Sequence, residues 1–201
     1  MIKRITPLLL TIIFTIPAVA TDLPSVFKKS YEYEYAGNYK NAIAVLKDIY
    51  DKESYEINLR LGWLYFNSSL FQQASEYYDK CIASKPLSIE AKFGKIKVLT
   101  AMGYWDKAIK QYNEIFRVDP SNSKAHYKLG LIYYNRKDFR NALKHFEKVV
   151  NLYPFDHDGL LMSAWTNLQL QKFKEAKVLF EKVLMNTPGD ESALEGLTYI
   201  K

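Results

Sequence analysis

The sequence predicts an all-α fold: a right-handed α-solenoid of about five helix hairpins followed by a C-terminal capping helix. Two series of small or helix-ending residues recur close to every 34 positions, and they are the main observations behind this prediction. They are the alanines Ala42, Ala74, Ala108, Ala142 and Ala176 and the prolines Pro86, Pro120, Pro154 and Pro188. A period of 34 residues is typical of solenoids that are built from helix pairs.

Large apolar residues follow the same period on either side of each alanine. One column, three residues before the alanine, reads Tyr39, Phe71, Trp105, Phe139 and Phe173, and another, four residues after it, reads Leu46, Tyr78, Tyr112, Phe146 and Phe180. Spacings of three, four and seven residues place such positions on one face of a helix. We expect the ring ahead of the alanine to plug each hairpin and to bury roughly 150 to 250 Å² of surface.

The first half of each repeat has a companion pattern. Leu61–Gly62 and Leu129–Gly130 are each followed three residues later by a tyrosine. With the ladders, this pattern resembles the tetratricopeptide repeat family over about residues 23 to 201, although Asn58, Lys92, His126 and Leu160 stand where that family has tryptophan. The repeat register divides the array, residues 21–201, into units 23–54, 55–88, 89–122, 123–156 and 157–190, with a capping helix over 191–201.

Residues 1–20 have a different character. Lys3 and Arg4 precede an apolar stretch from Ile5 to Ile16, and Ala18, Val19 and Ala20 form a small-residue site after it. This arrangement predicts a secretory signal peptide, hence an exported protein, periplasmic or secreted, without a stable membrane span after cleavage. A retained anchor stays open as the alternative.

Composition excludes several classes of function. Without Lys3 and Arg4, 26 basic side chains face 22 acidic ones, and this net charge of +4 is spread through all the units, which does not indicate nucleic-acid binding. Cys81 is the only cysteine, and its column predicts a small buried group rather than a nucleophile.

The sequence predicts no enzyme, no catalytic residue, no cofactor and no metal site. His126, His145 and His157 fall in unrelated columns, and none has a second ligand at metal-binding spacing. The run from Asp156 to Gly159 lies between two units, where acidic residues commonly start a helix, so we interpret it as a turn and cap rather than a calcium loop.

The resemblance implies a binding surface on the inner wall of the solenoid, which this family builds mainly from first helices. Columns two, five, six, nine, twelve and thirteen of the units, together with the cap, then supply the candidate peptide-binding residues. Aromatic side chains alternate there with positive or amide groups, and few carboxylates interrupt them; the residues are Tyr31, Tyr35, Arg60, Trp63, Phe66, Asn67, Phe93, Lys97, Lys124, Tyr127, Lys128, Tyr134, Asn135, Trp165, Gln169 and Tyr199.

Rings beside lysine or arginine suit an extended peptide, because stacking gives affinity and the cations select acidic groups. The sequence therefore predicts a non-enzymatic scaffold or adaptor of the cell envelope or secreted space, with a protein or peptide partner. A glycan-binding module and a regulatory subunit of an envelope enzyme complex are the alternatives, and homo-oligomerisation stays open. Tyr31, Phe93 and Tyr127 have a second interpretation, in which they mainly pack between neighbouring first helices.

Overall fold

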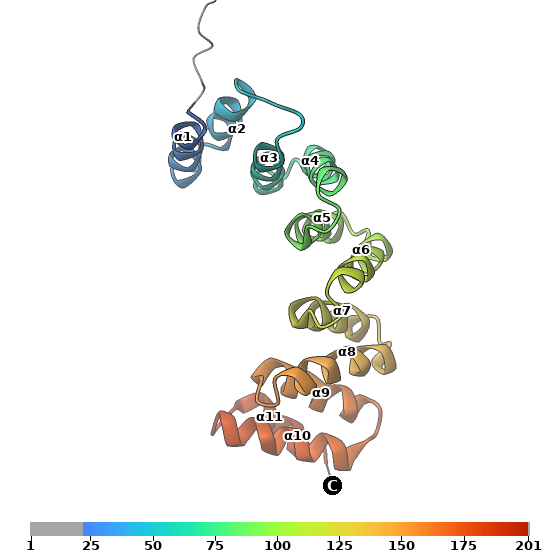
Figure 1. Cartoon of the computed structure of the whole chain (residues 1–201). Coiled ribbons are helices and arrows are strands. Elements are labelled where there is room, and N and C mark those ends of the chain that lie inside the picture. Colours follow the sequence, from blue (N-terminus) through green and yellow to red (C-terminus); the bar gives the residue numbers. More distant parts are fainter. Residues whose placement is uncertain (1–21, 201) are drawn as a thin grey trace, which may run out of the picture. The chain divides into compact units, whose positions relative to one another are not determined.

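The computed structural model describes residues 22–200, which contain eleven helices and no strand, so the predicted all-α solenoid fold is confirmed for this part of the chain (Figure 1). The predicted signal peptide, residues 1–20, lies outside the described residues. The helices are α1 (Leu23–Tyr35), α2 (Tyr39–Lys47), α3 (Tyr55–Asn67), α4 (Phe71–Ser84), α5 (Ile89–Ala101), α6 (Trp105–Val118), α7 (Ser123–Asn135), α8 (Phe139–Leu152), α9 (His157–Gln169), α10 (Phe173–Asn186) and α11 (Glu191–Thr198).

Contacts divide the described chain into two units, residues 22–49 and residues 50–200. In the N-terminal unit, α1 packs against α2, and Ala42 and Leu46 are fully buried. The hydroxyl of Ser30, also fully buried, donates a hydrogen bond of 3.1 Å to the Ala42 carbonyl. This bond ties the two helices of the hairpin together.

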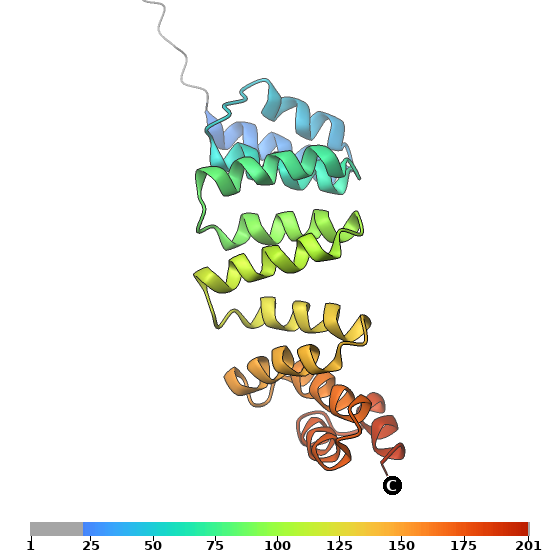
Figure 2. The ribbon, with the colours of Figure 1, turned by 90° about the vertical axis from the view of Figure 1, so that its right-hand side faces the viewer.

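The second unit contains α3 to α11. Each first helix packs against the second helix of its own hairpin, and each second helix packs against the next first helix (Figure 2). The first helices begin at Tyr55, Ile89, Ser123 and His157, which is the 34-residue register. The four prolines of the ladder each follow the end of a second helix by two residues, because proline cannot continue a helix without losing a hydrogen bond.

The helix starts obey the same period. A side-chain oxygen of the N-cap residue of each first helix in the second unit, and of α11, accepts a hydrogen bond from the backbone N–H three positions later, and such a cap contributes about 1 kcal/mol. In the second unit the capping residues of α3, α5, α7, α9 and α11 are Ser54, Ser88, Asn122, Asp156 and Asp190. This ladder of caps has a strict 34-residue spacing, a further periodic signal in the sequence.

The prediction that the aromatic residue ahead of the alanine plugs each hairpin was wrong for Trp105 and Phe173, whereas Tyr39, Phe71 and Phe139 are partly buried. Trp105 and Phe173 remain 44% and 45% exposed; each is the first residue of its second helix, directly after the turn that joins the two helices of the hairpin. The ring four residues after the alanine is buried instead: Tyr78 is 3% exposed, and Phe146 and Phe180 are fully buried. The core of the hairpins therefore depends on this later column.

Glycines make room for these buried rings. A β-carbon placed on Gly62 would lie 3.1 Å from the Tyr78 ring, and one on Gly94, in the next hairpin, would lie 2.1 Å from the same ring. A β-carbon on Gly130 would likewise lie 2.6 Å from the Phe146 ring. The Tyr78 ring thus lies between two first helices whose backbones approach it as closely as only glycine allows.

Three of the four positions that replace the family's tryptophan share one hydrogen bond, and the fourth is the apolar Leu160. Three buried side chains each donate to the carbonyl oxygen six residues earlier, in the turn that precedes their helix. The donors and acceptors are Asn58 to Lys52 at 2.8 Å, Lys92 to Pro86, and His126 Nε2 to Pro120 at 3.0 Å. Three chemically different groups therefore donate to the equivalent turn carbonyl in three repeats.

Candidate functional site

Lysines lie over aromatic rings along the first helices of successive hairpins. The Nζ atom of Lys97 in α5 is 4.6 Å from the centre of the Trp63 ring in α3, and Lys124 Nζ in α7 is 4.9 Å from the Phe93 ring in α5. Within α7, Lys128 Nζ lies 5.7 Å from the Tyr127 ring. We call these six residues the first-helix wall. Each exposed cation–ring contact contributes about 0.5 to 1 kcal/mol, so the lysines are held in place but keep their charge at the surface.

The lysines of the first-helix wall form no ion pair within the described residues. Lys97, Lys124 and Lys128 are all exposed, and no carboxylate within 22–200 pairs with them. Carboxylates are nevertheless more frequent here than predicted, because Glu90 and Asp158 occupy the column of Lys124 in the neighbouring units. The three lysines of the first-helix wall lie on α5 and α7, and Glu90 lies in the first turn of α5.

A hollow of about 360 Å³ lies at the C-terminal end of the same series of first helices. We call it the C-terminal hollow; it is lined by Trp165, Leu168, Gln169, Phe173, Glu195 and Tyr199. The Trp165 and Tyr199 rings meet at 60° with their centres 6.1 Å apart. Trp165 Nε1 donates a hydrogen bond of 2.9 Å to Ser192 Oγ, and the Tyr199 hydroxyl donates one of 3.2 Å to Glu195. Three predicted groove residues, Trp165, Gln169 and Tyr199, thus line one concave site whose rings are held by hydrogen bonds.

Several other predicted residues have mainly internal contacts. Phe66 and Tyr134 pack against the rings that begin the following helices, with ring centres 5.7 Å from Phe71 and 5.4 Å from Phe139. Phe93 and Tyr127 contact the buried rings of Tyr112 and Phe146 besides the lysines above, so packing and surface roles combine in these two residues.

The remaining predicted residues differ in exposure. Arg60 is only 6% exposed, so its guanidinium group is not a surface group as predicted, and the Asn67 amide donates to the Trp63 carbonyl of its own helix at 2.8 Å. Asn135 is exposed. Tyr31 and Tyr35 stack on each other at 6.3 Å in the N-terminal unit, where Tyr35 is 85% exposed.

Two histidines from different columns of the repeat are in contact. His126 Nδ1 and His145 Nδ1 are 2.9 Å apart, and His126 Nε2 is bonded to the Pro120 carbonyl, which can only accept. In the neutral pair, His126 therefore carries its proton on Nε2, and His145 donates from Nδ1. Burial, helped by the charge of His126, lowers the pKa of His145 to about 4. The pair is stacked between Phe116 and Tyr133, with ring distances of 4.2 Å and 5.6 Å, and is a packing element.

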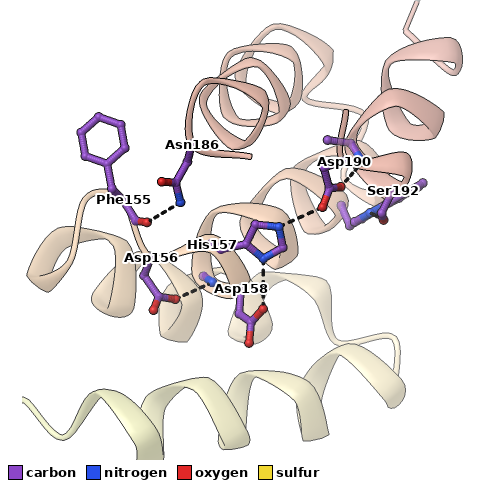
Figure 3. A network of polar contacts seen from close by, with 10 residues as sticks. Phe155, Asp156, His157, Asp158, Asn186, Asp190 and Ser192 are labelled. Atoms are coloured by element: carbon purple, nitrogen blue, oxygen red, sulfur yellow. Dashed lines mark hydrogen bonds and ion pairs between the residues drawn. The ribbon is translucent and has the colours of Figure 1, made fainter. Parts of the chain in front are cut away.

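The third histidine belongs to a network at the start of α9 (Figure 3). His157 Nε2 lies 2.9 Å from Asp190 and His157 Nδ1 lies 3.2 Å from Asp158, and these bonds raise the pKa of His157. Asp156 accepts a hydrogen bond of 2.7 Å from the Gly159 amide. The run from Asp156 to Gly159 is therefore a turn and cap, as predicted, and the histidine links the first turns of α9 and α11.

The thiol of Cys81 is fully buried, and burial raises its pKa to about 12, so it is protonated at neutral pH.

Among residues 22–200, no group of three or more histidine, cysteine, aspartate or glutamate side chains is arranged to hold a metal ion. The same residues include no helix with the length and apolar character needed to cross a bilayer.

Family models match three stretches of the chain. Models described as tetratricopeptide repeat match residues 55–86 and 123–156, and one described as TPR repeat matches residues 97–136. The chain is a tetratricopeptide repeat protein. Its repeats correspond to the hairpins α3–α4 and α7–α8 and to a stretch from α5 to α7.

Other tetratricopeptide repeat proteins are similar to this one in sequence. The TPR repeat-containing protein YpiA of Bacillus subtilis is 25% identical over 169 residues, which is 82% of this chain and 40% of YpiA. Anaphase-promoting complex subunit 3 of Schizosaccharomyces pombe is 29% identical over 92 residues, 46% of this chain and 14% of that protein. The chain thus spans less than half the length of these curated relatives.

Solved structures show the same fold. A tetratricopeptide repeat protein from Parabacteroides merdae superposes with a TM-score of 0.73 at 21% identity, over 86% of this chain and 70% of that one. YrrB, described as a TPR protein with an unusual peptide-binding site, superposes with a TM-score of 0.68 at 14% identity, over 86% of this chain and 90% of its own.

Proposed function

We propose that this tetratricopeptide repeat protein is a non-enzymatic scaffold that binds an extended segment of a partner protein along its first helices. The observation that carries the proposal is the combination of unpaired lysines over rings on the first-helix wall with the C-terminal hollow farther along the same series of helices. Peptide binding by YrrB, a protein of the same fold, supports it as an analogy.

The two parts of the site favour different groups in the ligand. Lys97, Lys124 and Lys128 favour carboxylates, because their charge has no acidic partner within the described residues. The C-terminal hollow has three rings and a carboxylate, so it favours an apolar side chain with a donor group rather than an acidic one. We therefore propose a segment that carries acidic residues and, at some distance along it, an apolar or aromatic anchor.

Selection from a random peptide library on the purified protein tests this directly. Enriched peptides are expected to contain acidic residues, and the triple change of Lys97, Lys124 and Lys128 to alanine is expected to weaken their binding at least tenfold. The matched control changes three exposed lysines of second helices, Lys148, Lys177 and Lys182, to alanine and should alter affinity less than twofold.

The anchor is tested separately. Gln169→Arg should block the C-terminal hollow while its exposed position preserves the fold, and it should remove the preference for an apolar anchor but not for acidic residues. If the second-helix lysines proved as important as those of the first-helix wall, or if selection enriched basic peptides, the proposed ligand class would be refuted.

We also propose that the protein acts after export, in the periplasm or outside the cell, on the basis of the signal-peptide pattern in residues 1–20. N-terminal sequencing of the protein isolated from its own cells should find a chain that starts near Thr21. A protein that keeps Met1 and fractionates with the cytoplasm would refute export.

A further inference from the structure

A second concave site lies away from the first-helix wall. It has a volume of about 560 Å³ and lies among α8, α9 and α10. Val150, Val178 and Leu179 provide apolar walls, Ser163 and Asn167 of α9 contribute polar groups, and charged side chains such as Glu147 and Lys172 also line it. Two of its three helices are second helices, so it is a different surface from the candidate peptide site. We call it the α8–α10 pocket.

The other repeats show what fills the equivalent space. In the α7–α8 hairpin, the Tyr133 ring stacks on His145 with 5.6 Å between ring centres and an interplanar angle of 6°. In the α3–α4 hairpin, Tyr65 stacks on Tyr77 at 5.2 Å and 8°. Counting 34 residues on from Tyr133 and His145 leads to Asn167 and Leu179, both of which line the α8–α10 pocket. The pocket thus occurs where the stacked pair of rings is replaced by two shorter side chains.

The α5–α6 hairpin provides a contrast. There the equivalent residues are Leu99 and Gln111, and they line a smaller hollow of about 360 Å³. Lysines at positions 95, 107 and 110 also line that hollow, and Lys95 is bonded to Asp79 and to Ser75. The missing rings therefore leave a cationic hollow in one hairpin and a hollow with apolar walls in the other.

A buried polar atom in the α8–α10 pocket lacks a partner. Ser163 is 1% exposed, and its hydroxyl has no hydrogen-bond partner in the described structure. The equivalent positions hold Leu61 and Leu129, which need none, and Lys95, which has its own. A buried hydroxyl without a partner destabilises the folded protein, so a ligand group that bonded to Ser163 would recover part of this loss.

We propose that the α8–α10 pocket binds a tyrosine side chain of a partner protein. The chain itself places a tyrosine ring at this point in two of its other hairpins, so the backbone geometry of the repeat accommodates one. Val150 and Leu179 would contact the ring faces, and the phenol hydroxyl would give Ser163 its missing partner. This second site is independent of the peptide site on the first helices.

The test uses N-acetyl-tyrosine amide as a probe, with amide chemical shifts of the isotope-labelled full chain as the measurement. Saturable shifts are expected for residues around Ser163, Asn167 and Leu179. N-acetyl-phenylalanine amide should bind roughly two- to tenfold more weakly, since one hydrogen bond contributes about 0.5 to 1.5 kcal/mol. Ser163→Ala should keep binding of both probes and remove the difference between them.

A filling variant supplies the decisive comparison. Asn167→Tyr restores the residue of the α3–α4 and α7–α8 hairpins and should abolish the shifts, whereas Leu99→Tyr, the same change in the α5–α6 hairpin, should leave them unchanged. Thermal unfolding of both variants confirms that they fold. The proposal is overturned if the probe does not saturate, if its shifts map to the first-helix wall or the C-terminal hollow, or if folded Asn167→Tyr binds it as well as the parent does.

Discussion

The close approach of Gly94 to the buried Tyr78 ring leads to a sharp prediction about stability. A β-carbon on Gly94 would lie 2.1 Å from Tyr78 Cε1, about 1.3 Å inside the 3.4 Å at which ordinary contacts begin. Tyr78 is 3% exposed and is bounded on its other side by Gly62, so the ring has little room to move. Gly94→Ala should therefore force the hairpins α3–α4 and α5–α6 apart.

Two opposing effects determine the size of the change. Replacing a helical glycine by alanine stabilises the helix by about 1 kcal/mol, and overpacking a filled core costs about 1 to 3 kcal/mol. Because the overlap is this large, the overpacking cost should lie in the upper part of its range. After the gain in helix stability is subtracted, the free energy of unfolding should fall by about 1 to 2 kcal/mol. Gly62→Ala is the matched control: its β-carbon would lie 3.1 Å from the same ring, and its net effect should be close to zero.

Urea unfolding followed by circular dichroism measures both variants, with amide hydrogen exchange of α4 and α5 as a local readout, because repeat arrays do not always unfold in one step. In a background where Tyr78→Leu removes the ring, Gly94→Ala should lose most of its cost, which is a coupling between the two sites. The packing argument fails if Gly94→Ala is as stable as Gly62→Ala, or if Tyr78→Leu leaves its cost unchanged.

Three further predictions follow from buried polar groups. Lys92→Met should lower the free energy of unfolding by about 1 to 3 kcal/mol, because the Pro86 carbonyl loses its donor. Lys92→His, which copies His126, should restore much of this free energy in the same urea assay. His145 has a pKa lowered to about 4, so as the pH drops the unfolded chain takes up a proton on this histidine before the folded chain does, and the free energy of unfolding should fall between pH 6.5 and 4. After allowance for partial exposure, His145→Tyr should remove about 1 to 2 kcal/mol of this loss. An acid-unfolding profile that His145→Tyr leaves unchanged would contradict this prediction. Cys81 should not react with a thiol-specific disulfide reagent at neutral pH until urea unfolds the protein, since burial keeps its thiol protonated; rapid reaction of the native protein would contradict this.

The agreement between sequence and structure is strongest where a residue acts within its own repeat. Pro120 and Pro154 end second helices wherever they occur, and Ala142 and Phe146 lie one turn apart on any helix, so their period alone predicts the hairpins. The lysine and ring columns on the first helices follow from the same period. The sequence alone could have predicted the pairing of Lys97 with Trp63, because both residues occupy the ninth column of adjacent repeats.

What the sequence determined by itself was therefore the helix pairs, their order and the face that each helix buries, because these depend on contacts a few residues apart and repeated every 34. Only the tertiary structure decided which aromatic column forms the core, that His126 meets His145, and that Asn167 and Leu179 leave a pocket. Those outcomes depend on the distance between neighbouring helices and on whether two side chains from different helices together fill the space between those helices. A single column of residues at one repeat position predicts neither of them.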